Sequence, residues 1–191
     1  MDHAAKKPSY LGLLNAIALA EGRAHQYLTC WAAKTTDPDV RKVVSTVAIR
    51  EGEHSHAFTK RLCELGYGVL DRPDPAFEKK MAIANADCSD LEKFEALGYR
   101  RGAEPRDLFK GVFDDLTIDC RSGELLGRYI CEERDSERML QACYQALCQR
   151  AEHGQARSAV AGSELRELHD RLDEICSAIG KLQHEVTALR G

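Results

Sequence analysis

Four residues in the middle of otherwise apolar helical stretches could hold a metal ion. Glu51 and His54 stand three residues apart, which places a carboxylate and an imidazole on one side of a helix, one turn apart. Glu21 and Glu133 each interrupt an apolar face elsewhere in the chain. A carboxylate buried at such a position is costly unless it is paired or bound to a cation. This set of oxygen and nitrogen donors suits Fe or Mn, so the sequence predicts a site for one of these metals.

A second Glu-x-x-His step, Glu53 with His56, overlaps the first. The two steps differ in the helix face that they share with their neighbours. Glu51 and His54 continue an apolar stripe along the helix, whereas Glu53 and His56 fall on its more polar side. We therefore predict that Glu51 and His54 face the core, and that Glu53 and His56 face solvent.

A buried polar cluster without metal is the alternative interpretation of these residues. Arg23, Arg50 or Arg134 could neutralise one carboxylate, and His54 could hydrogen-bond another. Three carboxylates in a low-dielectric core repel one another, however, and at least one would be protonated unless a cation holds them. This repulsion favours the metal interpretation.

Helices must position these residues, because no segment alternates apolar and polar residues over the length of a strand. The periodicity of the apolar residues predicts four long helices, at about residues 9–33, 38–65, 121–150 and 160–188. The polar residues 151–157 are expected to form a turn between the last two. Short helices are expected after Asp74-Pro75, after Ser89 and after Pro105.

Two helical hairpins, residues 9–66 and 121–188, are thus separated by the connection 67–120. A short turn within each hairpin makes its two helices antiparallel neighbours. The long connection is explained if the third helix starts beside the start of the second, which spans about 40 Å. The expected fold is one all-α domain, residues 1–191, formed by a four-helix bundle with a long crossover.

This arrangement resembles the ferritin-like superfamily, and within it the rubrerythrin-like bacterial proteins that lack a rubredoxin domain. The resemblance covers the two hairpins, and the crossover adds no matching motif. In that family the four helices give, in order, a Glu, a Glu-x-x-His, a Glu and a second Glu-x-x-His. The first four of these six places are occupied by Glu21, Glu51, His54 and Glu133.

The last helix departs from the family's pattern, because Leu165 and Leu168 stand where the final Glu and His would fall. The nearest candidate ligands lie off that stripe: Glu164, Glu167, His169 and Asp170. His25, one turn after Glu21, is a further candidate.

Three arrangements therefore stay open. One ion could be held by Glu21, Glu51 and His54, with or without Glu133. Two ions could be held if a crossover residue completes the site; the candidates are Asp114, Asp115 and Asp119. The third arrangement is a bundle that no longer binds metal.

Composition excludes several other classes of function. The net charge of −4 and the scattered Lys and Arg residues argue against binding to nucleic acid or to an anionic membrane surface. None of the eight cysteines forms a Cys-x-x-Cys pair, which argues against a zinc ribbon or a thioredoxin-type motif. No stretch approaches the roughly twenty apolar residues of a membrane span, and no export signal is evident, so a cytoplasmic protein is expected.

The resemblance implies a non-haem iron or manganese protein that reduces peroxide or O₂, or oxidises Fe(II). A reductase of this kind needs an external electron donor, because the chain carries no rubredoxin-like module. The alternative is a metal-free helical bundle that serves as an interaction or assembly module through the leucines of its last helix. A homo-oligomer, specifically a dimer, is expected.

Overall fold

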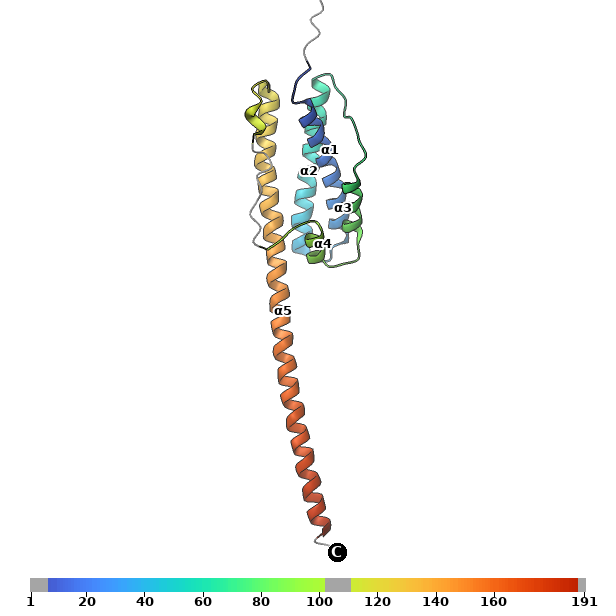
Figure 1. The fold of residues 1–191 in the computed structure, drawn as a ribbon, viewed down its shortest axis with the longest axis vertical. Coiled ribbons are helices and arrows are strands. Elements are labelled where there is room, and N and C mark those ends of the chain that lie inside the picture. Colours follow the sequence, from blue (N-terminus) through green and yellow to red (C-terminus); the bar gives the residue numbers. More distant parts are fainter. Residues whose placement is uncertain (1–6, 102–110, 189–191) are drawn as a thin grey trace, which may run out of the picture. The chain divides into compact units, whose positions relative to one another are not determined.

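The computed structural model describes residues 7–101 and 111–188, with only a few side chains after His153. Its long helices are α1 (Leu11–Lys34), α2 (Pro38–Glu64) and α5 (Cys120–Ala188) (Figure 1). Three short elements follow α2 and precede α5 in the chain: α3 (Pro75–Asn85), α4 (Asp90–Ala96) and the 3-10 turn η1 (Val112–Asp114). The described residues contain no strand, so the prediction of an all-α protein is confirmed. None of the described helices is long and apolar enough to cross a membrane.

The first two helices begin and end where the sequence predicts. Asp37 caps α2, since its Oδ1 accepts hydrogen bonds from the backbone N–H groups of Asp39 at 2.9 Å and Val40 at 3.2 Å. Beyond the end of α2, Gly66 takes a φ of 83°, a conformation that favours glycine. The turn between Lys34 and Pro38 is short, so α1 and α2 form an antiparallel hairpin.

The crossover contains two of the short helices that the sequence predicts. Asp74 caps α3, and its Oδ1 accepts from the N–H of Ala76 at 3.0 Å. Ser89 and Glu92 form the predicted capping box at the start of α4. The helix expected after Pro105 falls mostly outside the described residues.

The prediction of a turn at residues 151–157 is wrong. Helix α5 runs without a break from Cys120 to Ala188, so residues 121–188 do not form a hairpin. Gly154 is the only strong helix breaker in that stretch, and Ala, Gln and Arg around it are good helix formers. One glycine costs a helix about 1 kcal/mol, which is too little to end it.

The chain divides into two compact units, Met1–Leu147 and Cys148–Gly191, and the single domain that the sequence predicted stays a prediction. The first unit contains α1 to α4 and the start of α5. The second unit is the remainder of α5. The specific arrangement of four helices in one bundle is not observed among the described residues of the first unit, which places three long helical segments together.

The expected direction of the third long helix is also wrong. The start of α5 lies beside the end of α2, because Arg61 contacts both Asp119 Oδ1 at 2.8 Å and Ser122 Oγ at 2.9 Å. In the first unit α5 therefore runs antiparallel to α2 and parallel to α1. The long connection has another cause: α4 reaches the far end of α1, where Asp90 accepts hydrogen bonds from Trp31 and Thr35. The chain then returns to start α5.

The core of the first unit lies between α1, α2 and α5, adjacent to the four candidate ligands. The buried side chains that form it share apolar character and come from all three helices: Tyr10, Leu11, Leu14, Ile17, Ala18, Phe58, Leu62, Leu126, Tyr129 and Ile130. Burial of this cluster fixes the three helices against one another. The polar residues of the candidate site follow the same faces, about one turn further from this end.

Candidate metal centre

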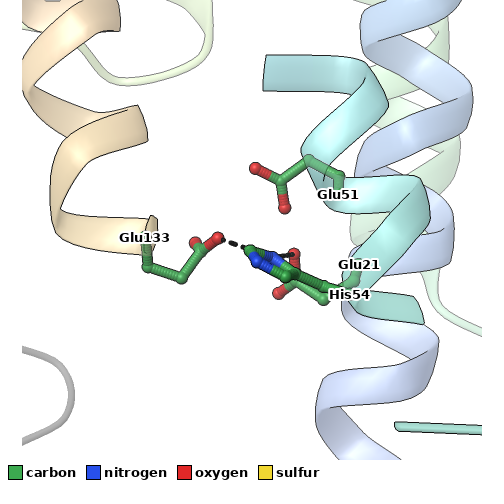
Figure 2. A group of neighbouring side chains, drawn as sticks. All are labelled: Glu21, Glu51, His54 and Glu133. Atoms are coloured by element: carbon green, nitrogen blue, oxygen red, sulfur yellow. Dashed lines mark ion pairs between the residues drawn. The ribbon is translucent and has the colours of Figure 1, made fainter. Parts of the chain in front are cut away.

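The first unit brings together all four residues that the sequence singles out. One ligand atom from each lies within 4.8 Å of the others, and the residues are Glu21, Glu51, His54 and Glu133 (Figure 2). Their side chains come from three helices, α1, α2 and α5, and converge between them. Glu53 and His56 are exposed, so the prediction of which Glu-x-x-His step faces inward is confirmed.

Two glycines let α1 and α2 approach closely at the level of the site. A Cβ atom on Gly22 would lie 2.9 Å from Ser55 Oγ, and one on Gly52 would lie 2.9 Å from His25 Nδ1. Each glycine directly follows a candidate ligand in the sequence. Both contacting side chains hydrogen-bond across the helix pair: Ser55 Oγ donates to Ala18 O at 2.9 Å, and His25 Nδ1 to a carbonyl of α2 at 2.7 Å.

His54 is held by a carboxylate that sequence reasoning missed. Its Nε2–H donates to Glu132 Oε2 at 2.7 Å. The other ring nitrogen, Nδ1, lies 3.2 Å from Glu133 Oε1 and 3.8 Å from Glu21 Oε2. Because Glu132 accepts a hydrogen bond from Nε2–H, neutral His54 keeps its proton on Nε2 and its lone pair on Nδ1. Nδ1 faces the other candidate ligands. The adjacent pair Glu132-Glu133 was the available signal in the sequence.

Three buried atoms at the centre of the cluster lack hydrogen-bond partners. They are Glu21 Oε2, His54 Nδ1 and Glu133 Oε1, which are the atoms that approach one another. Their side chains are 7%, 6% and 19% exposed, respectively, so water does not readily satisfy them. Buried polar atoms normally find a partner, and an orphaned group needs an explanation such as an ion.

The electrostatics of the cluster show how much it requires positive charge. Burial, reinforced by the neighbouring Glu21 and Glu133, raises the pKa of Glu51 to about 11. Burial alone would lower the pKa of His54, but the three glutamates around its ring outweigh that effect and raise the pKa to about 10. Without metal at neutral pH, Glu51 is therefore protonated and His54 is an imidazolium.

Tyr129 closes the site toward the core. Its hydroxyl donates to Glu21 Oε1 at 2.8 Å, and its ring stands edge-on to His54 and to Phe58, with centroids 5.1 Å away in both cases. Burial raises the pKa of Glu21, but the neighbouring His54 and Glu51 and the hydrogen bond from Tyr129 together outweigh it, and the pKa lies below its ordinary value. Glu21 is thus ionised at neutral pH, whereas burial raises the pKa of Glu133 above its ordinary value.

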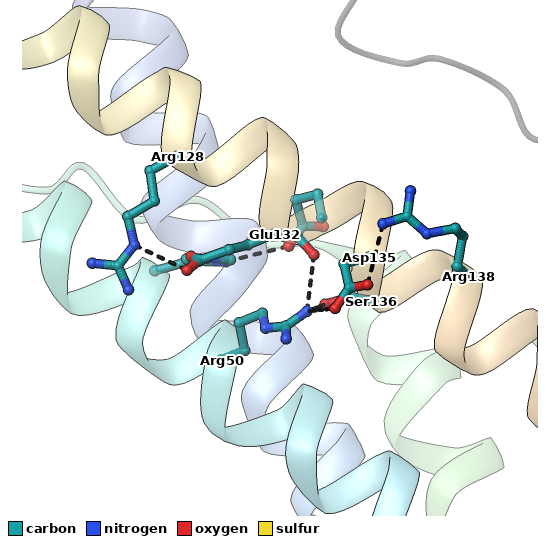
Figure 3. Close-up of polar contacts among 8 residues, drawn as sticks. Arg50, Arg128, Glu132, Asp135, Ser136 and Arg138 are labelled. Carbon is teal, nitrogen blue, oxygen red and sulfur yellow. Dashed lines mark hydrogen bonds and ion pairs between the residues drawn. The ribbon is translucent and has the colours of Figure 1, made fainter.

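A polar network beside the site attaches α5 to α2. Arg50 donates to the carbonyl of Glu132 at 3.0 Å, to Asp135 Oδ2 at 3.1 Å and to Ser136 Oγ at 3.0 Å (Figure 3). Arg128 Nε donates to Glu132 Oε1 at 2.9 Å, which leaves the other oxygen of that carboxylate for the imidazole. This network fixes the position of Glu132, and Arg50 is engaged with it rather than with the central carboxylates.

The remaining candidate ligands lie elsewhere. His25 is bonded to the Ala48 carbonyl and is not part of the cluster. His169 is exposed and belongs to the second unit. Asp119 bonds to Arg61 and Ser122, and Asp115 to Ser9 at 2.5 Å.

The crossover aspartates therefore do not complete a two-metal site. Asp119 directly precedes α5, and Glu133 lies fourteen positions further along the chain, which corresponds to about 21 Å of helix. Asp114 and Asp115 precede Asp119 at the same end of the first unit. The two-metal arrangement with these residues is not supported by their positions.

Comparisons of the chain with protein-family models, with curated proteins and with solved structures found no match. The site is therefore interpreted from its own geometry and chemistry.

Proposed function

We propose that the chain binds one divalent transition-metal ion, Fe(II) or Mn(II), through Glu21, Glu51, His54 and Glu133. The observation that carries the proposal is the meeting of three buried, orphaned ligand atoms from three helices. Three carboxylates and one imidazole match the preference of these ions for oxygen and nitrogen donors. The first four ligands of the ferritin-like pattern are the same set, although the direction of α5 differs from the one that we expected from the resemblance.

Charge balance supports a cation at this place. With all three carboxylates ionised and the imidazole neutral, the four side chains carry a charge of about −3, which a low-dielectric site does not tolerate. The metal-free site holds protons on Glu51 and His54 instead. A divalent ion can replace these protons, so binding is expected to release about two protons per ion at neutral pH.

A single ion fits the described residues better than two. The four donors surround one position, and the aspartates of the crossover are engaged at the end of the first unit. Glu132 would hold the imidazole with Nδ1 toward the ion, as carboxylates commonly do for metal-binding histidines. Tyr129 would hold Glu21 in place and exclude water from the core side.

A bound iron or manganese ion would supply redox chemistry toward peroxide, O₂ or, for a ferroxidase, Fe(II) itself. Four protein donors leave coordination positions for water or for such a substrate. Reduction of an oxidant would draw its electrons from an external donor. The residues of this chain would hold the ion, and the ion would displace the protons that Glu51 and His54 carry in the metal-free site.

Element analysis tests the proposal. Protein purified from cells supplied with iron and manganese should carry about one ion per chain, and Glu51→Ala should lose it. Glu53→Ala is the matched control, because that residue is exposed two positions away on the same helix. Less than about a tenth of an ion per chain in the wild type, unchanged by Glu51→Ala, would contradict the proposal.

A metal-free role as an interaction module is the second candidate. The exposed leucines of the second unit favour it, since they offer a protein-binding surface that does not involve the carboxylates. This candidate predicts that metal is absent and that Glu51→Ala and His54→Ala leave every association of the chain unchanged.

A further inference from the structure

The second unit is a single helical segment that exposes large apolar side chains. Leu168 and Leu172 lie one turn apart on α5, and both are 58% exposed. A single exposed leucine is ordinary in a protein of this size. These two are unusual because they belong to a regular pattern in the sequence.

The apolar positions of this segment alternate in steps of four and three. They are Ala161, Leu165, Leu168, Leu172, Ile175, Ile179 and Leu182. The mean step of 3.5 residues is that of a coiled coil, whereas a helix packed on a globular core has a wider stripe with a period of 3.6. Glu164 and Arg171 flank the stripe on one side, and His169 and Gln183 flank it on the other, over three heptads.

We propose that residues 161–182 of α5 form a parallel, two-stranded coiled coil with a second copy of this chain. Leu165, Leu172 and Ile179 occupy heptad a positions, and Ala161, Leu168, Ile175 and Leu182 occupy d positions. The pair Ile179 and Leu182 has the β-branched a and leucine d residues that favour two strands, whereas Leu172 and Ile175 have the reverse order. A second copy presents the same seam, so each a or d residue packs against the same residue of the second copy, and no further partner is needed. This inference does not depend on metal binding.

The charges beside the seam set the direction of the two helices. In a parallel pair, Glu164 at a g position faces His169 of the second copy at an e position, and no like charges meet. In the antiparallel pair that overlaps the whole seam, Glu164 faces Glu185 of the second copy, and this contact occurs twice. Like charges at such positions are unfavourable, so the parallel arrangement is preferred.

The molar mass of the full chain in solution tests the association. Sedimentation equilibrium should give about 43 kDa, twice the 21.3 kDa of one chain. Leu168→Glu places a charge in the seam and should weaken dimerisation about 100-fold or more. Arg166→Glu changes the net charge by more, but at an exposed heptad b position two residues away, and should keep the dimer.

Disulfide formation tests the direction. In the parallel pair the two d positions of one layer are adjacent, so the variant Leu168→Cys should form a disulfide between its two introduced thiols on mild oxidation. In the antiparallel pair, residue 168 faces residue 179, and this disulfide does not form. Peptide mapping separates it from bonds made by the eight natural cysteines.

Several results would overturn the proposal. A wild type that is monomeric at a concentration on the order of 50 μM would do so, as would a trimeric or tetrameric mass. Equal masses for Leu168→Glu and Arg166→Glu would also contradict it. The last such result is absence of the disulfide between two copies of Leu168→Cys. Misfolding of the variant is detected independently, because the single tryptophan, Trp31, is buried in the first unit and its fluorescence reports on that unit. Dissociation of the wild-type dimer on dilution is a further test, and it needs no variant.

Discussion

The two units of this protein depart from ordinary burial in opposite directions. In the first unit, Glu21, Glu51 and His54 are buried at 4–5% exposure, although their side chains are polar. In the second, Leu168 and Leu172 are 58% exposed, although their side chains are apolar. Both departures cost free energy in the isolated chain. The two proposals remove each cost with a different component: a cation for the first unit, and an apolar protein surface for the second.

Both units contain part of α5, so they differ in what surrounds this helix and not in whether the helix forms. In the first unit the apolar face of α5 packs into a core with α1 and α2. In the second unit the seam meets no other element of the same unit among the described residues, because that unit is a single helix. The comparison makes the two proposals independent, and each can be tested without disturbing the other.

The largest effect is expected from loss of a direct ligand. His54→Ala should weaken Mn(II) or Fe(II) binding by more than about 100-fold, beyond the 10- to 100-fold typical of outer residues. His56→Ala, which removes an exposed imidazole one half-turn away, should change the affinity less than about twofold. Isothermal titration of metal-free protein measures both.

The same pair of variants tests the independence of the two units. The molar mass of His54→Ala should equal that of the wild type, and Leu168→Glu should bind metal with wild-type affinity. A change of mass in the first variant, or of metal affinity in the second, would show that the two departures are coupled.

A smaller loss of affinity is expected from Glu132→Gln. The amide oxygen still accepts the hydrogen bond from His54 Nε2, but the negative charge is lost, so metal binding should weaken about 10-fold. Glu124→Gln is the control, at an exposed position on the same helix. The ring nitrogen chemical shifts of His54 provide a second measurement: they should shift in Glu132→Gln and not in Glu124→Gln. Unchanged shifts would show that Glu132 does not set the tautomer.

Glu51→Gln should stabilise the metal-free protein while it removes metal binding. A carboxyl whose pKa is raised from 4.5 to about 11 binds a proton in the folded state that it lacks when unfolded, so folding stability falls as pH rises above 4.5. At pH 7 the neutral amide removes this cost, and the free energy of unfolding measured with urea should be higher by roughly 1–3 kcal/mol. Glu53→Gln, at an exposed site, should stay within about 0.5 kcal/mol. A destabilised Glu51→Gln would contradict the assignment of a protonated Glu51.

The sequence predicted which four side chains meet better than it predicted the fold around them. The periodicity of α2 was sufficient to place Glu51 and His54 inside and Glu53 and His56 outside, since a helix that packs on one side has one buried face. Glu132 was missed because it lies beside the apolar stripe of α5 and contributes only through its contact with His54. That contact depends on the distance between two helices, which periodicity does not report.

The errors in the fold have related causes. The polar residues around Gly154 predict a turn, but a single glycine among good helix formers costs a helix too little to end it, and α5 continues. The direction of α5 was predicted from the length of the connection alone. The described part of the connection instead reaches the far end of α1, where Asp90 accepts hydrogen bonds from Trp31 and Thr35.

The smallest effect concerns a polar cluster of the first unit that needs no cation. Burial raises the pKa of Asp119, but hydrogen bonds from Tyr10, Ser122 and Arg61 outweigh it and hold the pKa well below its ordinary value. The stability that Asp119 contributes is present above about pH 4 and is lost as pH falls further. Because its side chain is 38% exposed, Asp119→Asn should cost only about 1 kcal/mol at pH 7.

The unfolding of this variant, followed through Trp31 fluorescence, should depend less on pH below about pH 4 than that of the wild type. Asp87→Asn is the control, since Asp87 is 97% exposed beside Lys34. Addition of Mn(II) should raise the stability of Asp119→Asn as much as that of the wild type, because the groups around Asp119 satisfy one another. An equal acid dependence in Asp119→Asn and the wild type would show that the hydrogen bonds to Asp119 do not stabilise its ionised form. The cluster around Asp119 would then not differ from the glutamate cluster, in which buried atoms lack partners.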